Sequence, residues 1–473
     1  MDRTPQRQTA RSRRLMTGVT LVTAATMAVI ATAYASSAMP RRPGGLTFPN
    51  PSGVIGIVGM DEADADTPFF KALGTNGRSC VTCHQPAQSW SITPAELRDR
   101  FDRTDGLDPI FRTNDGSNCD GADVSTIGKR RRAFSLLLQK GLIRIELDLP
   151  AGAEFEIVRL DDPYRCAGAL TSASMYRRPL PTANLRFLSG VMWDGRASKP
   201  GQAIRDGLIN QVVDAVTTHA RGTVPLPTQV QSIVDFELRL FSTQVVDRSA
   251  GSLAEGVARS GPARLAGELF CLGINDPLDM RPSMPGACAA SSGGLNPFVF
   301  ALFRGWTDAN SPHRQAIARG EAIFNTRQFV IDNVPGLNGR MEDPVRRPIL
   351  NGTCTVCHDT PNAGNHSVPM ALNIGVADAS RRTADQLLYT LRHRATGETV
   401  QTTDPGRAMV TGKWNDIGKV KGPVLRALAA RPPYFHDGSA ATLGDVIRFY
   451  DTRFQARFTD QERADLLAFL RAL

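Results

Sequence analysis

The sequence predicts a mainly α-helical fold of two helical domains, the first of which carries a small β-hairpin insertion. Apolar residues recur at helical spacing in 201–270, 313–325 and 459–473. A Cys-x-x-Cys-His segment occurs once in each half of the chain, and one turn containing Pro and Gly is flanked by alternating apolar residues. The repeated segment predicts two similar domains, and the alternation predicts the hairpin.

The first residues of the chain have the three parts of an export signal. A basic stretch ends at Arg14, an apolar segment runs from Leu15 to about Ala33, and the end of that segment fits a small-x-small cleavage site. We therefore expect a signal peptide over 1–35 and an extended lead-in over 36–68. The alternative is an uncleaved membrane anchor, because the apolar segment is nearly long enough to span a bilayer.

The composition is that of a soluble globular protein, with 41% hydrophobic and 21% charged residues. The formal charge is +9, but removal of 1–35 leaves 50 basic and 45 acidic residues. This mild surplus indicates a solvated surface or, alternatively, a basic face for an acidic partner. The sequence has no basic run with interleaved aromatic residues, so we expect no nucleic-acid partner.

The first predicted domain covers 69–271 and contains the hairpin and a helical region. Apolar residues alternate in 143–149 and again in 155–158, on either side of a turn at 150–152. The segment 201–270 has mostly helical spacing. We therefore expect one hairpin followed by helices.

A predicted linker over 272–310 leads to the second domain, 311–473. Its opening helix is expected over 313–325, where Gly320 allows a neighbouring element to approach closely. Its closing helix, 459–473, starts with a Thr-x-x-Glu capping box and has one apolar face. The second domain is therefore expected to begin and end with a helix.

Four of the eight cysteines lie outside the Cys-x-x-Cys-His segments, and an exported chain is expected to oxidise them. Cys271 and Cys288 flank a segment rich in Pro and Gly, which favours a bond between them. Cys119 would then pair with Cys166. Four cysteines allow three connectivities, so the spacing alone leaves the pairing open.

The two Cys-x-x-Cys-His segments predict two covalently attached haem c groups. Two thiols spaced i, i+3 on a turn can reach both vinyl-derived carbons of a haem, and the next residue then faces the iron. A zinc site would need further Cys or His near the first segment at regular spacing, and there are none. The predicted attachment residues and iron ligands are Cys80, Cys83, His84, Cys354, Cys357 and His358. Because haem c is attached outside the cytoplasm, we expect a periplasmic location.

The chain resembles the bacterial di-haem cytochrome c peroxidases and their MauG-type relatives. The residues that carry the resemblance are Cys80–His84, Pro181-Thr182, Trp193–Ala197, Cys354–His358, Gly422–Arg426, Pro433–Gly438 and Ala441–Tyr450. The resemblance implies two cytochrome c-like helical haem domains. One feature departs from the family: 109 positions separate His84 from Trp193, which is longer than usual and implies extra structure in the first domain.

The resemblance also assigns roles to residues beyond the haem segments. Trp193 would relay electrons between the two haems, or would otherwise be a buried aromatic residue that anchors the interface. At the second haem, the sixth iron ligand would be Tyr450, with Met409 as the rival. His436 and Asp437 would orient groups near the second haem.

At the first haem, the resemblance implies a pocket open to peroxide that is lined by Gln and Glu. Gln202 matches the Gln, but Val212 and Val213 stand in the region where Glu is expected. Asp214 or His219 could move the proton that peroxide cleavage requires. His219 could alternatively bind the iron directly or be an ordinary surface residue.

A calcium ion is also implied by the resemblance, held partly by an Asn ahead of the Pro-Thr pair. Pro179 stands at that place, and because it offers no side-chain oxygen, calcium is disfavoured. His366 has no motif around it and is expected to have no functional role.

The expected function is reduction of hydrogen peroxide by a di-haem oxidoreductase. A small electron-donor protein or a quinol-linked donor would supply electrons, and the family allows a homodimer. A MauG-type oxidase is a variant of this function. The alternative is a non-catalytic electron carrier in which both irons are six-coordinate.

Overall fold

The computed structural model describes residues 45–166, 168–199, 201–277, 295–338 and 350–473. The predicted signal peptide lies outside these ranges, as does the start of the lead-in. Residues from Gly44 to Leu473 form one compact unit. Within the described ranges, no helix has the length and apolar character needed to cross a membrane.

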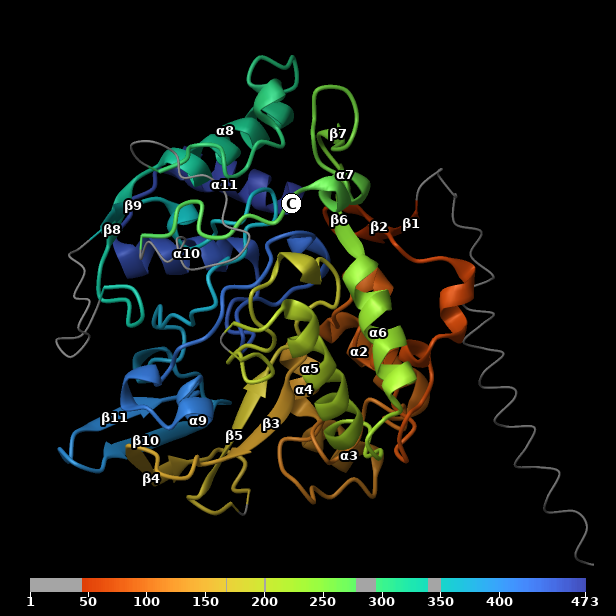
Figure 1. Ribbon diagram of the computed structural model, residues 1–473, viewed down its shortest axis with the longest axis vertical. Coiled ribbons are helices and arrows are strands. Elements are labelled where there is room, and N and C mark those ends of the chain that lie inside the picture. The colour runs from red at the N-terminus through yellow and green to blue at the C-terminus, as the bar shows by residue number, and fades with distance from the viewer. Residues whose placement is uncertain (1–44, 167, 200, 278–294, 339–349) are drawn as a thin grey trace, which may run out of the picture. The chain divides into compact units, whose positions relative to one another are not determined.

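The predicted mainly α-helical fold is wrong, because the described residues form a mixed α/β structure that is 34% helical and 17% strand (Figure 1). Four sheets contain its strands. The helices are α2 (Pro94–Thr104), α3 (Ile127–Ala133), α4 (Ser135–Lys140), α5 (Ile204–Thr218), α6 (Pro227–Arg239), α7 (Pro262–Gly267), α8 (Pro312–Thr326), α9 (Ala408–Thr411), α10 (Leu443–Phe454) and α11 (Asp460–Ala472). The strands are β1 (Leu46–Asn50), β2 (Gly53–Val58), β3 (Ile143–Asp148), β4 (Phe155–Asp161), β5 (Ser172–Arg177), β6 (Phe241–Asp247), β7 (Gly251–Ser252), β8 (Phe329–Ile331), β9 (Leu350–Gly352), β10 (Leu388–His393) and β11 (Thr399–Thr402).

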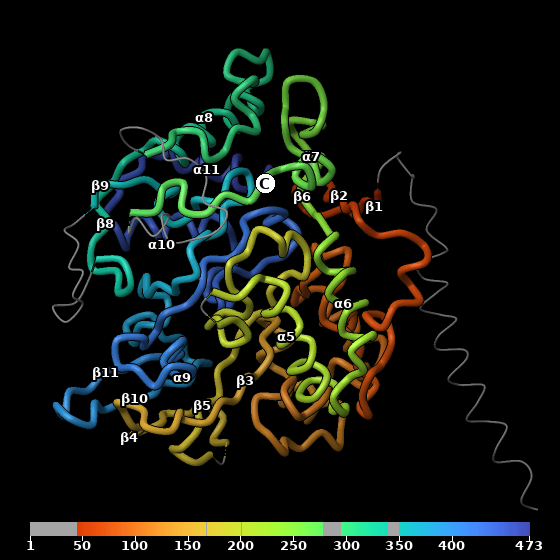
Figure 2. The backbone as a smooth tube through the Cα atoms, viewed as in Figure 1, coloured from red at the N-terminus to blue at the C-terminus, as the bar shows by residue number. Residues whose placement is uncertain are grey.

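The predicted β-hairpin is also corrected. Strands form on both sides of the turn at 150–152, as β3 and β4, but they do not pair with each other. β3 pairs with β5, whereas β4 pairs with β10, more than 200 residues further along the chain (Figure 2). Alternation in the sequence identifies a half-buried strand but carries no information about its partner, and this is why the hairpin was expected.

The largest sheet joins the start of the described chain to its middle. Its strand order is β1-β2-β6-β7, and every neighbouring pair is antiparallel. The sheet also contacts the C-terminus, because the backbone N–H of Gln244 in β6 donates to the carbonyl of Leu473 at 3.3 Å. The pairing of β2 with β6 could not be predicted because these strands are distant in sequence, whereas β1 and β2 pair locally within the segment that was expected to be an extended lead-in.

The helix pair α8 and α11 follows the sequence prediction closely. Thr459 caps α11 together with Glu462, as expected from the capping box. A Cβ atom on Gly320 would lie 2.0 Å from the carbonyl oxygen of Asp465, so the two helices can approach this closely only because residue 320 is glycine. Their apolar faces meet in a core that includes Phe324 and Phe469.

A disulfide bond joins Cys119 and Cys166, as predicted. It lies in the long segment between the first Cys-x-x-Cys-His turn and Trp193. Cys271 is also disulfide-bonded. Its predicted partner, Cys288, lies outside the described residues.

Candidate functional site

The first Cys-x-x-Cys-His segment lies on the wall of a cavity of about 190 Å³, the first cavity. Cys80 begins a short 3-10 turn, and the backbone N–H groups of Cys83 and His84 both donate to the Cys80 carbonyl, at 3.1 and 3.0 Å. This turn places both thiols and the imidazole on one wall. The arrangement fits a haem attached through two thioethers and held by a histidine from the same side.

The second segment repeats this geometry in a cavity of about 210 Å³, the second cavity. Cys354 starts another 3-10 turn, and the carbonyl of Cys354 accepts from the backbone N–H of His358 at 3.1 Å. Apolar side chains from α8 and α10 complete the wall, among them Phe324, whose ring centroid lies 5.9 Å from that of His358. The second cavity therefore offers a second apolar haem site.

Both histidines are held in the form that binds iron. Nδ1 of His84 lies 3.0 Å from the carbonyl oxygen of Trp90, and Nδ1 of His358 lies 2.7 Å from that of Gly364. Because a carbonyl oxygen only accepts, each Nδ1 carries the proton and each Nε2 keeps a free electron pair. Burial lowers the pKa of His84 to about 4 and also lowers the pKa of His358, so both rings stay neutral. The residues present thus fit haem c at both places.

Trp193 lies between the two candidate haem sites, because it lines both cavities. Its Nε1–H donates to the carbonyl of Arg178 at 2.7 Å, and its ring makes an edge contact with His436 at a centroid distance of 6.1 Å. The backbone N–H of Lys421 donates to the carbonyl of Trp193 at 2.7 Å. These contacts fix the indole at the junction of the cavities.

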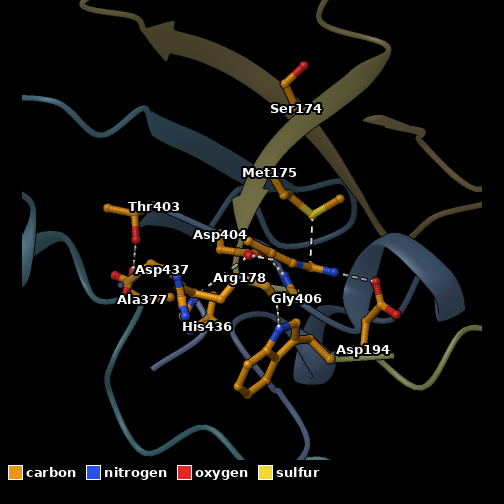
Figure 3. A network of polar contacts seen from close by, with 12 residues as sticks. Ser174, Met175, Arg178, Asp194, Ala377, Thr403, Asp404, Gly406, His436 and Asp437 are labelled. Atoms are coloured by element: carbon orange, nitrogen blue, oxygen red, sulfur yellow. Dashed lines mark hydrogen bonds and ion pairs between the residues drawn. The ribbon is translucent and has the colours of Figure 1, made fainter. Parts of the chain in front are cut away.

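A buried charge network adjoins Trp193, and the sequence analysis missed two of its members. Arg177 binds Asp194 at 2.5 Å on one side and Asp404 at 2.7 Å on the other. Nε2 of His436 lies 3.5 Å from Asp404 (Figure 3). Burial would raise the pKa of Asp404, but Arg177 and His436 outweigh it and bring the pKa to about 2. Arg177 and Asp404 are 227 positions apart, and no motif links them.

His219 lies in the first cavity, at the C-terminal end of α5. Its Nδ1 is 2.5 Å from Oδ2 of Asp115, and Arg78 pairs with the other oxygen of that carboxylate. Burial would raise the pKa of Asp115, but these two partners lower it below its ordinary value. The aspartate therefore stays charged and fixes the orientation of the imidazole.

The other predicted residues of the peroxide pocket are placed differently. Gln202 is exposed, does not line the first cavity, and accepts from the backbone N–H of Lys199 at 3.2 Å. Asp214 faces Arg196 at 3.6 Å. A buried carboxyl does line the first cavity: it belongs to Glu237 on α6, and burial raises its pKa to about 8. A helical sequence pattern gave no signal for Glu237.

At the second cavity, Tyr450 lines the wall and Met409 does not. Tyr450 stacks on Phe454 with ring centroids 6.1 Å apart. Met409 packs instead in the core beneath β4 and β10. His366, expected to be ordinary, lines the second cavity, and neither of its ring nitrogens has a hydrogen-bond partner among the described residues.

The place predicted for a calcium ligand is occupied by Pro179, whose carbonyl accepts from the Ser91 hydroxyl at 2.8 Å. Within the described ranges, no group of three or more His, Cys, Asp and Glu side chains is arranged to hold a metal ion.

Comparisons with known proteins agree with the predicted resemblance. No family model matches the chain. A cytochrome-c peroxidase, IdrP1, of Denitromonas iodatirespirans is 31% identical over 140 residues, which cover 25% of this chain and 36% of that protein. The protein of the same name from Pseudomonas sp. (strain SCT) is 28% identical over 147 residues, covering 26% of this chain and 38% of that protein. The chain thus spans a little over a third of the length of these curated relatives.

A solved structure is also similar, described as "Crystal structure of a MauG-like protein associated with microbial copper homeostasis". The match has a TM-score of 0.36 and 16% identity, and covers 91% of this chain and 94% of that one. The resemblance predicted from the motifs is confirmed by the two curated relatives: over the matched part, this chain is similar to the cytochrome-c peroxidases.

Proposed function

We propose that this chain is an exported, periplasmic di-haem c-type cytochrome that reduces hydrogen peroxide. Electrons would enter at the haem of the second cavity and pass through Trp193 to the haem of the first. One observation carries the proposal: Trp193 lines both cavities, and each cavity contains a complete Cys-x-x-Cys-His turn. The names of the two curated relatives support peroxidase activity.

The chain would hold each haem through three residues of one turn. Bound haem c supplies an iron that changes oxidation state and, where its sixth position is open, can bind peroxide. The thiols of Cys80 and Cys83, and of Cys354 and Cys357, would form the thioethers. The carbonyls of Trp90 and Gly364 fix the two imidazoles with Nε2 toward the iron.

The first cavity is the proposed peroxide site. Peroxide reduction consumes two electrons and two protons and yields two molecules of water, so a group in this cavity must move protons. His219 is suited to this, because it lines the cavity and Asp115 binds its Nδ1 and so orients the imidazole. Arg78 keeps Asp115 charged when the imidazole is neutral.

The second cavity is the proposed electron entry site. Tyr450 would be the sixth ligand there, since it lines the cavity while Met409 lies in a separate core. A phenolate donates charge to the iron and so favours ferric and higher oxidation states. The donor would be a small redox protein or a quinol-linked donor.

A second function is favoured by the environment of His219. Asp115 binds the Nδ1 of His219 as a carbonyl binds the Nδ1 of His84, so Nε2 of His219 would also be available to bind an iron. If it bound the first iron, both haems would be six-coordinate and the protein would be an electron carrier. If His219 instead left the first iron open, the first cavity would also allow a MauG-type oxidase with an organic or protein substrate.

One experiment separates these functions. The protein would be matured in a host that attaches haem c, and its spin states and peroxide consumption with a reduced donor would be measured. A high-spin ferric first haem with peroxide turnover is the expected result. Two low-spin haems that do not react with peroxide would leave only the carrier.

A further inference from the structure

Buried cations gather where the two cavities meet. Arg178 and Lys421 line both cavities, and Arg431 lines the second. The two guanidinium groups donate to backbone carbonyls: Arg178 to those of Lys140, Ile92 and Arg431, at 3.0, 2.7 and 3.2 Å, and Arg431 to those of Val424 and Arg426, at 2.6 and 3.0 Å. These carbonyls accept hydrogen bonds from the guanidinium groups but do not cancel their charge, and Nε of Arg431 has no hydrogen-bond partner among the described residues.

Lys421 differs from both arginines. It is only 7% exposed, and no hydrogen bond or ion pair of its ammonium is found among the described residues. Burial alone lowers its pKa to about 8. A buried ammonium without a partner is costly, because the charge loses its hydration and gains nothing in return.

The described residues supply no free anion at this place. The acidic residues on the wall of the first cavity are Asp115, which is paired with Arg78 and His219, and Glu237, whose raised pKa keeps it neutral near pH 7. The described wall of the second cavity contains no acidic residue. The junction therefore has a surplus of positive charge that an anion from outside the chain would balance.

We propose that Lys421 is the shared counter-charge for carboxylate groups of the two haems and so raises the reduction potentials of both. Each haem has two propionate carboxylates, and a residue that lines both cavities can be close to both haems. This inference rests on the proposed function, in that both cavities hold haem. A positive charge near the irons stabilises the ferrous over the ferric state, which raises the potential.

The test replaces the charge while keeping the size of the side chain. Lys421→Met and Lys421→Gln remove it, and Lys421→Arg keeps it. Lys419→Met is the matched control: it is two positions away, is paired with Asp416 at 3.0 Å, and lines neither cavity. Haem content per chain and the midpoint potential of each haem, by spectroelectrochemical titration, are measured for every variant.

The expected result is a downward shift of both midpoint potentials in the two neutral variants, with Lys421→Arg and Lys419→Met close to the wild type. Neutral variants with full haem content and unshifted potentials, or a shift of one haem only, would overturn the proposal. If the neutral variants fail to mature, Lys421→Arg decides: normal haem content and potentials support a role of the charge, and failure of this variant as well overturns it. A wild-type protein without haem would instead refute the proposed function.

Discussion

Nδ1 of His219 lies 2.5 Å from Oδ2 of Asp115, in the same cavity as the first Cys-x-x-Cys-His turn. This contact orients the imidazole within the cavity that would hold the first haem. It also leaves the two readings of His219, proton carrier and iron ligand, open to a direct test.

His219→Gln should lower peroxide turnover by about 10²- to 10⁴-fold, because that is the usual contribution of a positioned acid–base group. The spectrum of the first haem should remain high-spin. His313→Gln, at an exposed position on α8, should leave turnover unchanged. A first haem that is low-spin in the wild type and becomes high-spin in His219→Gln would show that His219 is the sixth ligand.

Trp193→Phe should remove most of the steady-state turnover while both haems stay attached. The phenyl ring is smaller and harder to oxidise than the indole, and it cannot donate to the carbonyl of Arg178. Stopped-flow oxidation of the second haem by peroxide measures the transfer directly. Trp414→Phe is the matched control, because that tryptophan lies in another core and lines neither cavity. Unchanged transfer in Trp193→Phe would refute the relay.

Tyr450→Phe should change the spin state of the second haem only, because it removes the one oxygen that this side chain can offer to the iron. Absorption and electron paramagnetic resonance spectra measure the change. Met409→Leu should have no such effect, since Met409 lies outside the cavity. The reverse pattern would assign the ligand to Met409.

Arg177→Met should destabilise the protein by about 3–5 kcal/mol, because it leaves the carboxylates of Asp194 and Asp404 buried without this cation. Chemical denaturation measures the loss. Arg392→Met, which breaks an exposed pair with Glu156, should cost less than about 1 kcal/mol. Equal losses of stability in the two variants would show that the buried network contributes no more than the exposed ion pair.

The lowered pKa of Asp404 predicts how the free energy of unfolding depends on pH. Its pKa is about 2 in the folded protein, against an ordinary value of 3.8. A depressed carboxyl pKa stabilises the fold above the unfolded pKa, so about 2–3 kcal/mol should be lost as the pH falls from 4 toward 2. In Asp404→Asn this part of the acid dependence should disappear. A variant with the acid dependence of the wild type would show that other groups cause it.

The haem-site turns and the closing helix could be predicted because each depends on residues close in sequence or on a strong motif. Thr459 and Glu462 cap α11 within one turn, and Cys80, Cys83 and His84 belong to one turn as well. The disulfide between Cys119 and Cys166 followed only from the assumed pairing of the other two cysteines, because spacing alone leaves the connectivity open. The long-range strand pairs could not be predicted, because β4 meets β10 and β2 meets β6 only after the chain has folded. The local pairing of β1 with β2 was missed because 36–68 was expected to be an extended lead-in. Local periodicity shows which residues are half-buried, not what covers them.

The same limit applies to the site. Lys421 precedes a block that carries the resemblance, but only the fold places its side chain between the two cavities. Asp115 lies far from His219 in the sequence, and Glu237 lies on another helix. The pKa of each carboxyl group depends on its burial and its neighbours in the fold. Gln202 matched by spacing alone and lies on the surface.

The most direct test of the account is the intact mass of the protein after maturation in a host that attaches haem c. The account predicts two haems on each chain, with peptide mapping that places them on Cys80 and Cys83 and on Cys354 and Cys357. A chain with the bare polypeptide mass, or with haem on one pair only, would contradict it.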